Sequence, residues 1–333
     1  MISPTVVCLG PHILDVLIRP VEAIPAGQGG VLLEQARVTA AGTAAGTAVD
    51  LAKLGATVLS MGVIGDDVNG RLVRMLLDEF GVDTGNVVVR KGEATATTVL
   101  PIRANGERPS LHLPGSIGML TAEDVDRELI ARADVLHVGG PDVLGSFTDE
   151  ALPDLLEFAT RHGTVVTVDL LRNRPAPGLL DRLAPVWPYV DYFLPNDDQL
   201  TSLASTEDLA DAAALVQQRG VTSVVVTTGG SGSRVFWSGG DTVVPAFAVD
   251  VVDTTGCGDA FSAGVIMGTQ FGWTLDMSAR LGTAAAALVA QGLGSDAGIV
   301  DLDSTLSFWR EHADELGVPP PLNSVTSTPR SPR

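Results

Sequence analysis

From residue 120 onward, short apolar segments alternate with longer segments that carry helical periodicity. The apolar runs occupy residues 135–140, 164–170, 191–196 and 223–230, and the helical segments occupy residues 121–133, 149–163 and 206–220. Thr121 and Asp124 suit a capping box at the start of the first helix. Strands that are apolar on both faces and separated by helices are typical of a parallel sheet covered on both sides, with right-handed crossovers. The pattern therefore predicts an α/β fold.

The residues before 120 follow a different pattern, typical of β-ribbons. Ribbon-like segments occur at residues 16–20, 31–40 and 95–113. Asn105-Gly106 is a strong hairpin-turn signal within the last of them. We expect a small sheet, with strands from about 14–40 and 95–114, that stands off the main sheet as a lid. An extension of the main sheet's edge is the alternative.

Charge and cysteine content limit the partners and the compartment. The net charge of −19 disfavours nucleic acids and anionic membranes, because both require a basic face. Cys8 and Cys257 lie far apart, and the five histidines lack metal-binding spacing. These features favour a reducing cytoplasm and disfavour a zinc site. We expect no signal peptide and no membrane span, since no segment has either pattern.

The length of the chain and the composition of its end suggest the domain organisation. The chain has 333 residues, and an α/β unit of this size is often one domain with an appendage. Residues 316–333 are rich in Pro, Ser and Thr. We therefore expect one domain over residues 1–315 and a disordered tail over residues 316–333.

Residues 251–264, "VVDTTGCGDAFSAG", combine a β-branched run, a glycine-bracketed turn and the start of a helix. Gly256 and Gly258 leave backbone N–H groups uncovered, and the helix adds unpaired N–H groups and the positive end of its dipole. Such a site binds a phosphoryl group. Asp259 stands at its edge as a candidate general base for phosphoryl transfer. A glycine turn with an Asp N-cap is the structural alternative.

Three other glycine motifs are incomplete. "GCGDAF" has Phe261 where a dinucleotide-binding turn has its third glycine, and "GDDVNGRL" has Arg71 where a P-loop has its lysine. "GGSGS" ends in Ser233 where a nucleophile elbow has glycine. These motifs therefore disfavour a dinucleotide fold, a P-loop and a serine hydrolase.

The sequence resembles the PfkB family of carbohydrate kinases, the ribokinase-like proteins. "DTTGCGDAFSAG" is similar to the family's second signature, and residues 40–84 are similar to its first signature region. "LGPHILD", "LPNDDQL" and "VVVTTGGSGSRVF" resemble three shorter family segments. The matches follow the family's order from about residue 6 to residue 300. The resemblance implies a three-layer ribokinase-like α/β fold, with a mostly parallel central sheet, helices on both faces and a small β-sheet lid.

The resemblance also implies an activity and a role for each matching residue. The chain would use ATP and Mg²⁺ to phosphorylate a hydroxyl of a sugar or sugar-like molecule. Asp259 would be the catalytic base, and the amides of Gly256, Cys257 and Gly258 would form the anion hole. Asp15 and Gly42 would hold the acceptor, with Gly46 at a further acceptor-binding position. The expected ATP site consists of Asn196, Thr227, Gly229 and Gly232. Asp253 and Thr255 match positions that bind a monovalent cation, such as K⁺, in some members.

The chain departs from the family at three positions. Gly46 replaces an Asn that contacts sugar hydroxyls, Gln199 replaces a Glu that helps organise magnesium and phosphate, and Leu171 replaces an Asn in "DLLRNR". These changes leave the acceptor open between a sugar and a nucleoside. They also motivate a further alternative, a non-catalytic sugar- or nucleotide-binding relative. Some relatives form homodimers through the lid. Cys257 suits a neutral filler better than a reactive thiol.

Overall fold

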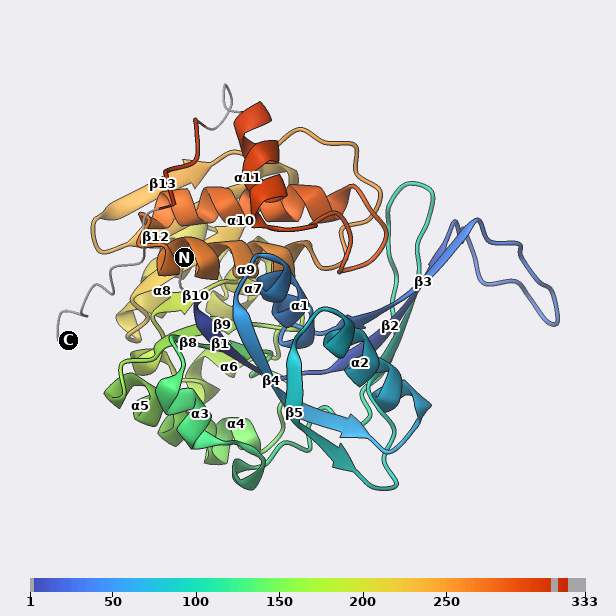
Figure 1. The fold of residues 1–333 in the computed structure, drawn as a ribbon, viewed down its shortest axis with the longest axis horizontal. Coiled ribbons are helices and arrows are strands. Elements are labelled where there is room, and N and C mark those ends of the chain that lie inside the picture. Colours follow the sequence, from blue (N-terminus) through green and yellow to red (C-terminus); the bar gives the residue numbers. More distant parts are fainter. Residues whose placement is uncertain (1–2, 313–316, 323–333) are drawn as a thin grey trace.

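The central layer of the protein is a nine-stranded sheet (Figure 1). The computed structural model describes residues 3–312 and 317–322. The sheet contains β1 (Thr5–Leu9), β4 (Thr57–Gly65), β5 (Asp83–Arg90), β8 (Val135–Gly139), β9 (Val165–Asp169), β10 (Tyr192–Phe193), β11 (Ser223–Thr227), β12 (Ser233–Trp237) and β13 (Gly240–Val244). Its order is β13-β12-β11-β10-β9-β8-β1-β4-β5. The strands from β11 to β5 run parallel, whereas β12 and β13 are antiparallel. This confirms the predicted mostly parallel sheet.

Helices cover both faces of this sheet, as the apolar strands require. One face carries α1 (Ala45–Lys53), α2 (Val68–Glu79), α9 (Cys257–Gln270), α10 (Leu275–Ala290) and α11 (Leu302–Glu311). The other carries α3 (Arg127–Arg132), α4 (Phe147–Glu150), α5 (Leu152–Arg161), α6 (Leu179–Arg182), α7 (Asp197–Ala204) and α8 (Leu209–Gln218). Successive residues of β1 serve the two cores: Val6 and Cys8 face one, and Val7 and Leu9 face the other. Figure 1 shows the layers around the sheet.

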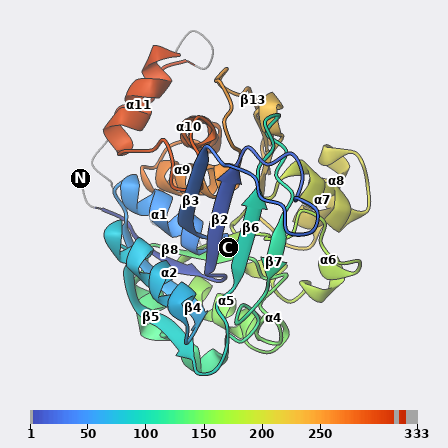
Figure 2. The same ribbon diagram turned by 90° about the vertical axis from the view of Figure 1, so that its right-hand side faces the viewer.

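A second, four-stranded sheet stands apart from the central one (Figure 2). It contains β2 (Ile13–Arg19), β3 (Gln35–Ala41), β6 (Thr97–Pro101) and β7 (Leu111–Leu113), in the order β3-β2-β6-β7. Strands β2 and β6 pair in parallel, and the other two pairs are antiparallel. The predicted small sheet is thus confirmed, and the alternative of an edge extension is wrong.

Some predicted elements differ in detail. The expected helix over 121–133 is a 3₁₀ turn, η1 (Ala122–Asp124), followed by α3, because Val125 is extended between them. Its capping box between Thr121 and Asp124 is present. The segment 149–163 divides between α4 and α5, and α5 carries Pro153 in its first turn, where proline is tolerated. Two further 3₁₀ turns are η2 (Trp187–Tyr189) and η3 (Gly229–Ser231).

The structure tests two further predictions only in part, the one about the tail and the one about a membrane span. Most of the predicted tail, residues 316 and 323–333, lies outside the described residues. In the described segment 317–322, the Gly317 carbonyl accepts a hydrogen bond from the Trp309 indole at 2.8 Å. Among the helices that the structure describes, none combines the length and the apolar character needed to cross a bilayer.

Asp50 places a carboxyl group inside the core. It is completely buried on α1, one turn beyond Gly46, and neither carboxylate oxygen has a hydrogen-bond partner among the described residues. Burial raises the pKa of Asp50 well above its usual value, against the opposing charge of Lys53. The folded protein therefore holds the proton of Asp50 more tightly than the unfolded chain does.

We predict that Asp50→Asn makes the protein more stable, and by more at pH 8 than at pH 5. A raised folded-state pKa gives stability that is complete below the unfolded pKa and is lost as the pH rises, and Asn removes that loss. The expected gain at pH 8 is at least about 1.4 kcal/mol, the equivalent of one pKa unit. Urea unfolding at both pH values measures it, with the exposed Asp250→Asn as control. A difference from wild type that does not vary with pH would contradict this account.

Candidate active site

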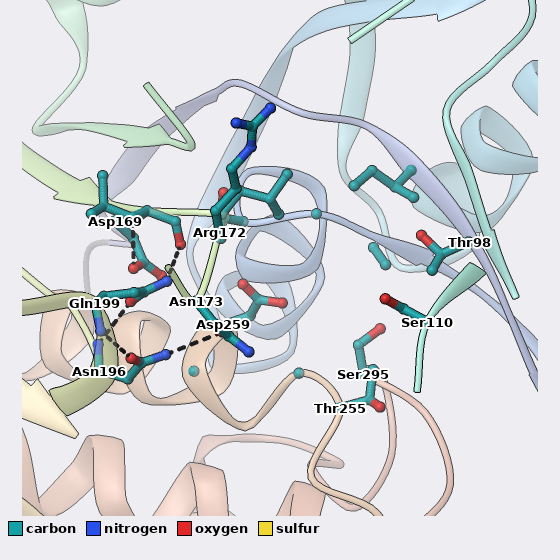
Figure 3. A pocket seen from close by; sticks show the side chains of 18 of the residues that line it. Thr98, Ser110, Asp169, Arg172, Asn173, Asn196, Gln199, Thr255, Asp259 and Ser295 are labelled. Atoms are coloured by element: carbon teal, nitrogen blue, oxygen red, sulfur yellow. Dashed lines mark hydrogen bonds between the residues drawn. The ribbon is translucent and has the colours of Figure 1, made fainter. Parts of the chain in front are cut away.

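A cavity of about 1110 Å³ lies where the small sheet faces the central sheet. The ends of β9 and β11 contribute Asp169 and Thr227 to its wall, and the small sheet contributes Asp15 and Thr98. The N-terminus of α9 supplies a third side. The carboxyl edge of a parallel sheet is the usual ligand position in such folds. Figure 3 shows side chains from these elements converging on one space.

Gly256 allows α9 to begin at the cavity wall. It caps the helix in the left-handed region, with φ of 81°, and a Cβ atom there would lie 2.4 Å from Ser295 Cα. Only glycine fits this position without strain. The N–H groups of Gly256 and Gly258 have no acceptor among the described residues, and Cys257 N–H makes one long 3.4 Å bond to the Thr254 carbonyl. These amides form a cradle for an anion.

Asp259 stands in the first turn of α9, half-buried beside that cradle. Burial raises the pKa of Asp259 to about 7, with a smaller contribution from the negative charge of Asp15. The charge of Arg108 and the hydroxyl of Thr47 lower it in part. A carboxyl group with a pKa near neutrality is suited to accept a proton under ordinary conditions.

Gly46 leaves the space that the Asp259 carboxylate occupies. A Cβ atom on Gly46 would lie 2.5 Å from Asp259 Oδ2, so any larger residue at position 46 would require the carboxylate to move. Gly46 itself does not line the cavity, whereas Gly42 does. Gly46 therefore makes room for the Asp259 carboxylate and offers the acceptor no side chain to contact.

The small sheet forms the wall opposite Asp259. Asp15 on β2 is buried, and burial raises its pKa to about 6 against the opposing Thr98 hydroxyl and Arg108 charge. Thr98 Oγ1 lies 3.0 Å from His112 Nδ1 on β7. Carboxylate, hydroxyl and imidazole groups side by side are suited to bind the hydroxyls of a polar molecule.

Asn196, Gln199, Thr227 and Gly229 line the far end of the cavity. Gln199 is a structural residue there: its side chain accepts from Asn196 N–H and donates to the Leu170 carbonyl, each at 2.8 Å. It completes a capping box with Asn196 at the start of α7. Gly232, predicted in the same site, does not line the cavity, because its turn packs on Val244 to Ala246.

The candidate cation residues belong to one tight loop. Asp253 is fully buried, and its carboxylate accepts from Thr255 N–H, Thr255 Oγ1 and Gly294 N–H at 3.0, 2.8 and 3.1 Å. Thr255 lines the cavity. No cluster of three or more His, Cys, Asp or Glu residues suitable for a metal occurs in the part of the chain that is described. Asp253 thus holds the loop together through three hydrogen bonds.

Cys257 is a filler, as expected. Burial raises the pKa of its thiol to about 12, and Sγ lies 3.5 Å from the Ala286 carbonyl. Its side chain is therefore protonated near neutrality, and only its backbone amide can contribute to the anion cradle.

Arg108 and Arg172 are site residues that the sequence does not reveal. Arg108 precedes β7 and donates to the hydroxyls of Thr254 and Thr255 at 3.1 and 3.5 Å. Arg172 follows β9 in "DLLRNR" and lines the same cavity. A single arginine in a ribbon or after a strand carries no local signal, and only the tertiary fold brings these two together.

Comparison with known proteins supplies an independent finding. Residues 3–301 match the family model described as pfkB family carbohydrate kinase. The chain is similar to fructokinase-1 of Zea mays, with 30% identity over 227 residues that cover 66% of this chain and 70% of the relative. It is also similar to ribokinase of Haemophilus influenzae, with 27% identity over 281 residues that cover 82% of this chain and 87% of the relative.

A solved structure shows the same fold. The ribokinase of Arabidopsis thaliana, complexed with ribose and ATP, is similar with a TM-score of 0.76 and 24% identity. The match covers 92% of this chain and 99% of that one. The ribokinase-like fold expected from the sequence is confirmed.

We predict that Gly256→Ala destabilises the protein by at least about 1–2 kcal/mol. That is the cost of a left-handed conformation for a residue with a Cβ atom, and the contact with Ser295 adds to it. Urea unfolding measures the change. Gly30→Ala is the matched control, because a Cβ atom there meets no other atom within 4 Å. Equal stability of the two variants would contradict the proposed need for glycine at position 256.

Proposed function

The chain belongs to the pfkB family of carbohydrate kinases, and we propose that it transfers the γ-phosphoryl group of ATP to a hydroxyl of a sugar or sugar-like molecule. The observation that carries this proposal is the position of Asp259. Its carboxylate, with a pKa of about 7, stands beside uncovered backbone amides in a cavity that also holds Asp15 and Thr98. A base, an anion cradle and a polar acceptor wall are the parts that phosphoryl transfer requires.

In the proposed reaction the acceptor lies between the small sheet and Asp259. The acceptor's hydroxyl oxygen attacks the γ-phosphorus, and its proton passes to the Asp259 carboxylate. The bond from the γ-phosphorus to the β–γ bridging oxygen breaks, and its electron pair leaves with ADP. The amides of Gly256, Cys257 and Gly258 stabilise the charge on the transferring group. Asp15 and the turn at Gly42 orient the acceptor.

The far end of the cavity is the proposed nucleotide site, with Asn196, Thr227 and Gly229 in its wall. Mg²⁺ would neutralise charge on the nucleotide's phosphates there. Asp169 is the protein group that fits this ion: burial and the charge of Asp259 hold its pKa well above the usual range. A divalent cation would reverse that shift. One carboxylate plus phosphates is a common way for proteins to bind Mg²⁺.

The cavity wall favours a sugar over a nucleoside as the acceptor. Among the described residues that line it there is no Phe, Tyr or Trp. A nucleobase is usually held by stacking on such rings. A nucleoside kinase therefore stands as the second candidate. The non-catalytic alternative is disfavoured, because the base and the cradle face the same space.

Three more specific expectations remain predictions. They are a cytoplasmic location, a homodimer formed through the small sheet, and activation by K⁺ at Asp253 and Thr255. Turnover in KCl and in tetramethylammonium chloride at equal ionic strength would test the last of these.

We predict that Asp259→Asn lowers kcat by about 10²–10⁴-fold, the usual contribution of a positioned general base. The affinity for ATP should stay within a few-fold of wild type, because the nucleotide site lies at the far end of the cavity. Steady-state kinetics and calorimetric titration measure the two effects. Asp250→Asn, which changes an exposed acid outside the cavity, should match wild type. An Asp259→Asn enzyme within tenfold of wild type would remove Asp259 from the mechanism.

We also predict that kcat/KM for a neutral acceptor rises with pH and reaches half its plateau near pH 7. The pKa of Asp259 is raised to about 7, so the carboxyl is protonated and inactive below that pH and ionised above it. Initial rates from pH 5.5 to 8.5 test this, after preincubation shows that the enzyme survives each pH. A flat profile over that range would show that no group with such a pKa controls the reaction.

A further inference from the structure

Two groups in the wall of the cavity have an unused capacity to bind an anion. The Arg172 side chain makes no hydrogen bond and no ion pair among the described residues, although its charge acts on the buried carboxyl of Asp142. The Asp142 oxygens accept instead from the backbone N–H groups of Leu171 and Arg172. His112 uses Nδ1 toward Thr98, and no hydrogen bond to its Nε2 occurs among the described residues. Both residues line the cavity, in a chain whose net charge is −19. Neither takes part in the phosphoryl-transfer steps proposed above.

Arg172 and His112 line the same cavity, although they come from different sheets. Arg172 follows β9 of the central sheet, and His112 lies on β7 of the small sheet. The charge of Arg172 adds to burial in lowering the pKa of His112. Figure 3 shows the guanidinium group of Arg172 pointing away from Asp259, in the cavity that both residues line.

A neutral acceptor would give the Arg172 guanidinium group no anionic partner. When ligand fills the cavity, water is displaced, and a cation that loses water without gaining an anion is destabilised. A guanidinium group binds a carboxylate or a phosphate through parallel charge-assisted hydrogen bonds. Position 46, moreover, offers the acceptor no side chain for its hydroxyls.

Arg108 has a different position from Arg172. It donates to Thr254 and Thr255 beside the anion cradle, and its charge lowers the pKa of Asp15 and Asp259. It therefore belongs to the phosphoryl-transfer end. Arg172 and His112 are left for a second anionic group, on the acceptor itself.

We propose that the acceptor carries its own anionic group, a carboxylate or a phosphate, and that Arg172 and His112 bind it. This inference rests on the proposed kinase function and specifies its substrate class. The acceptor is then a sugar acid or a sugar phosphate. Its anionic end lies against β7, and its reacting hydroxyl lies toward Asp259.

The test is a kinetic comparison of matched acceptors. D-gluconate is paired with D-glucose, D-fructose 6-phosphate with D-fructose, and D-ribose 5-phosphate with D-ribose. The anionic member of at least one pair should have a kcat/KM at least tenfold higher than its neutral partner. The pair that responds distinguishes a carboxylate from a phosphate. If each neutral sugar has a kcat/KM equal to or higher than that of its anionic partner, the inference is overturned.

Variants of the pair give the second arm. Arg172→Gln should raise the KM of the preferred anionic acceptor about tenfold to a hundredfold, the range of one charge-assisted hydrogen bond, and leave the KM of ATP unchanged. Arg172→Lys should recover part of the loss. Arg103→Gln, an exposed arginine that pairs with Glu107 outside the cavity, is the control. A KM effect on ATP, with none on the acceptor, would assign Arg172 to the nucleotide and overturn the inference.

The two proposals fail in different ways. Turnover of neutral sugars alone leaves the kinase function standing and overturns only the anionic acceptor. If no acceptor in the panel is phosphorylated by ATP, and Asp259→Asn changes no measured rate, the kinase function is overturned. The inference is then overturned with it.

Discussion

Helix α9 is buried along its middle nine residues, and this burial fixes where the reacting groups stand. Residues from Ala260 to Gly268 are buried without interruption, against α1, α10 and the sheet. This packing holds the helix in place, so its first turn meets the cavity at one point. Gly256 turns the chain into the helix, the uncovered amides follow, and Asp259 comes within the same turn. Small residues on α9 thus determine the position of an anion cradle and a base together.

The same burial sets the charge state of the site. Burial of Asp259 and Asp15 raises the pKa of each carboxyl, to about 7 and about 6. Arg108 opposes both shifts and keeps the base near neutrality. Asp50 is completely buried, and the charge of Lys53 opposes the rise of its pKa. For Asp259 the charge of Arg108 is the main influence that lowers the pKa, and the Thr47 hydroxyl adds to it.

The sequence predicted the layers and the cradle because both depend on local patterns. Apolar runs alternating with helical segments indicate a parallel sheet, and Gly256 to Asp259 are contiguous. It could not predict that Gly46 makes room for the Asp259 carboxylate, since that contact joins α1 to α9 across the core. The presence of Arg172 and His112 in one cavity wall likewise depends on how the small sheet sits over the cavity. By resemblance Gln199 is only a lost charge, whereas in the structure it caps α7 with Asn196.

The central claim is that burial gives Asp259 a pKa near 7. Its most direct measurement is a ¹³C NMR titration of protein labelled at the aspartate carboxyl carbons, with Asp259→Asn to identify the resonance. The account predicts one carboxyl resonance that titrates near pH 7 in the wild type and is absent from the variant. If the resonance lost in Asp259→Asn titrates below about pH 5, near the ordinary range for aspartate, the carboxyl is not tuned by its surroundings and the account is contradicted.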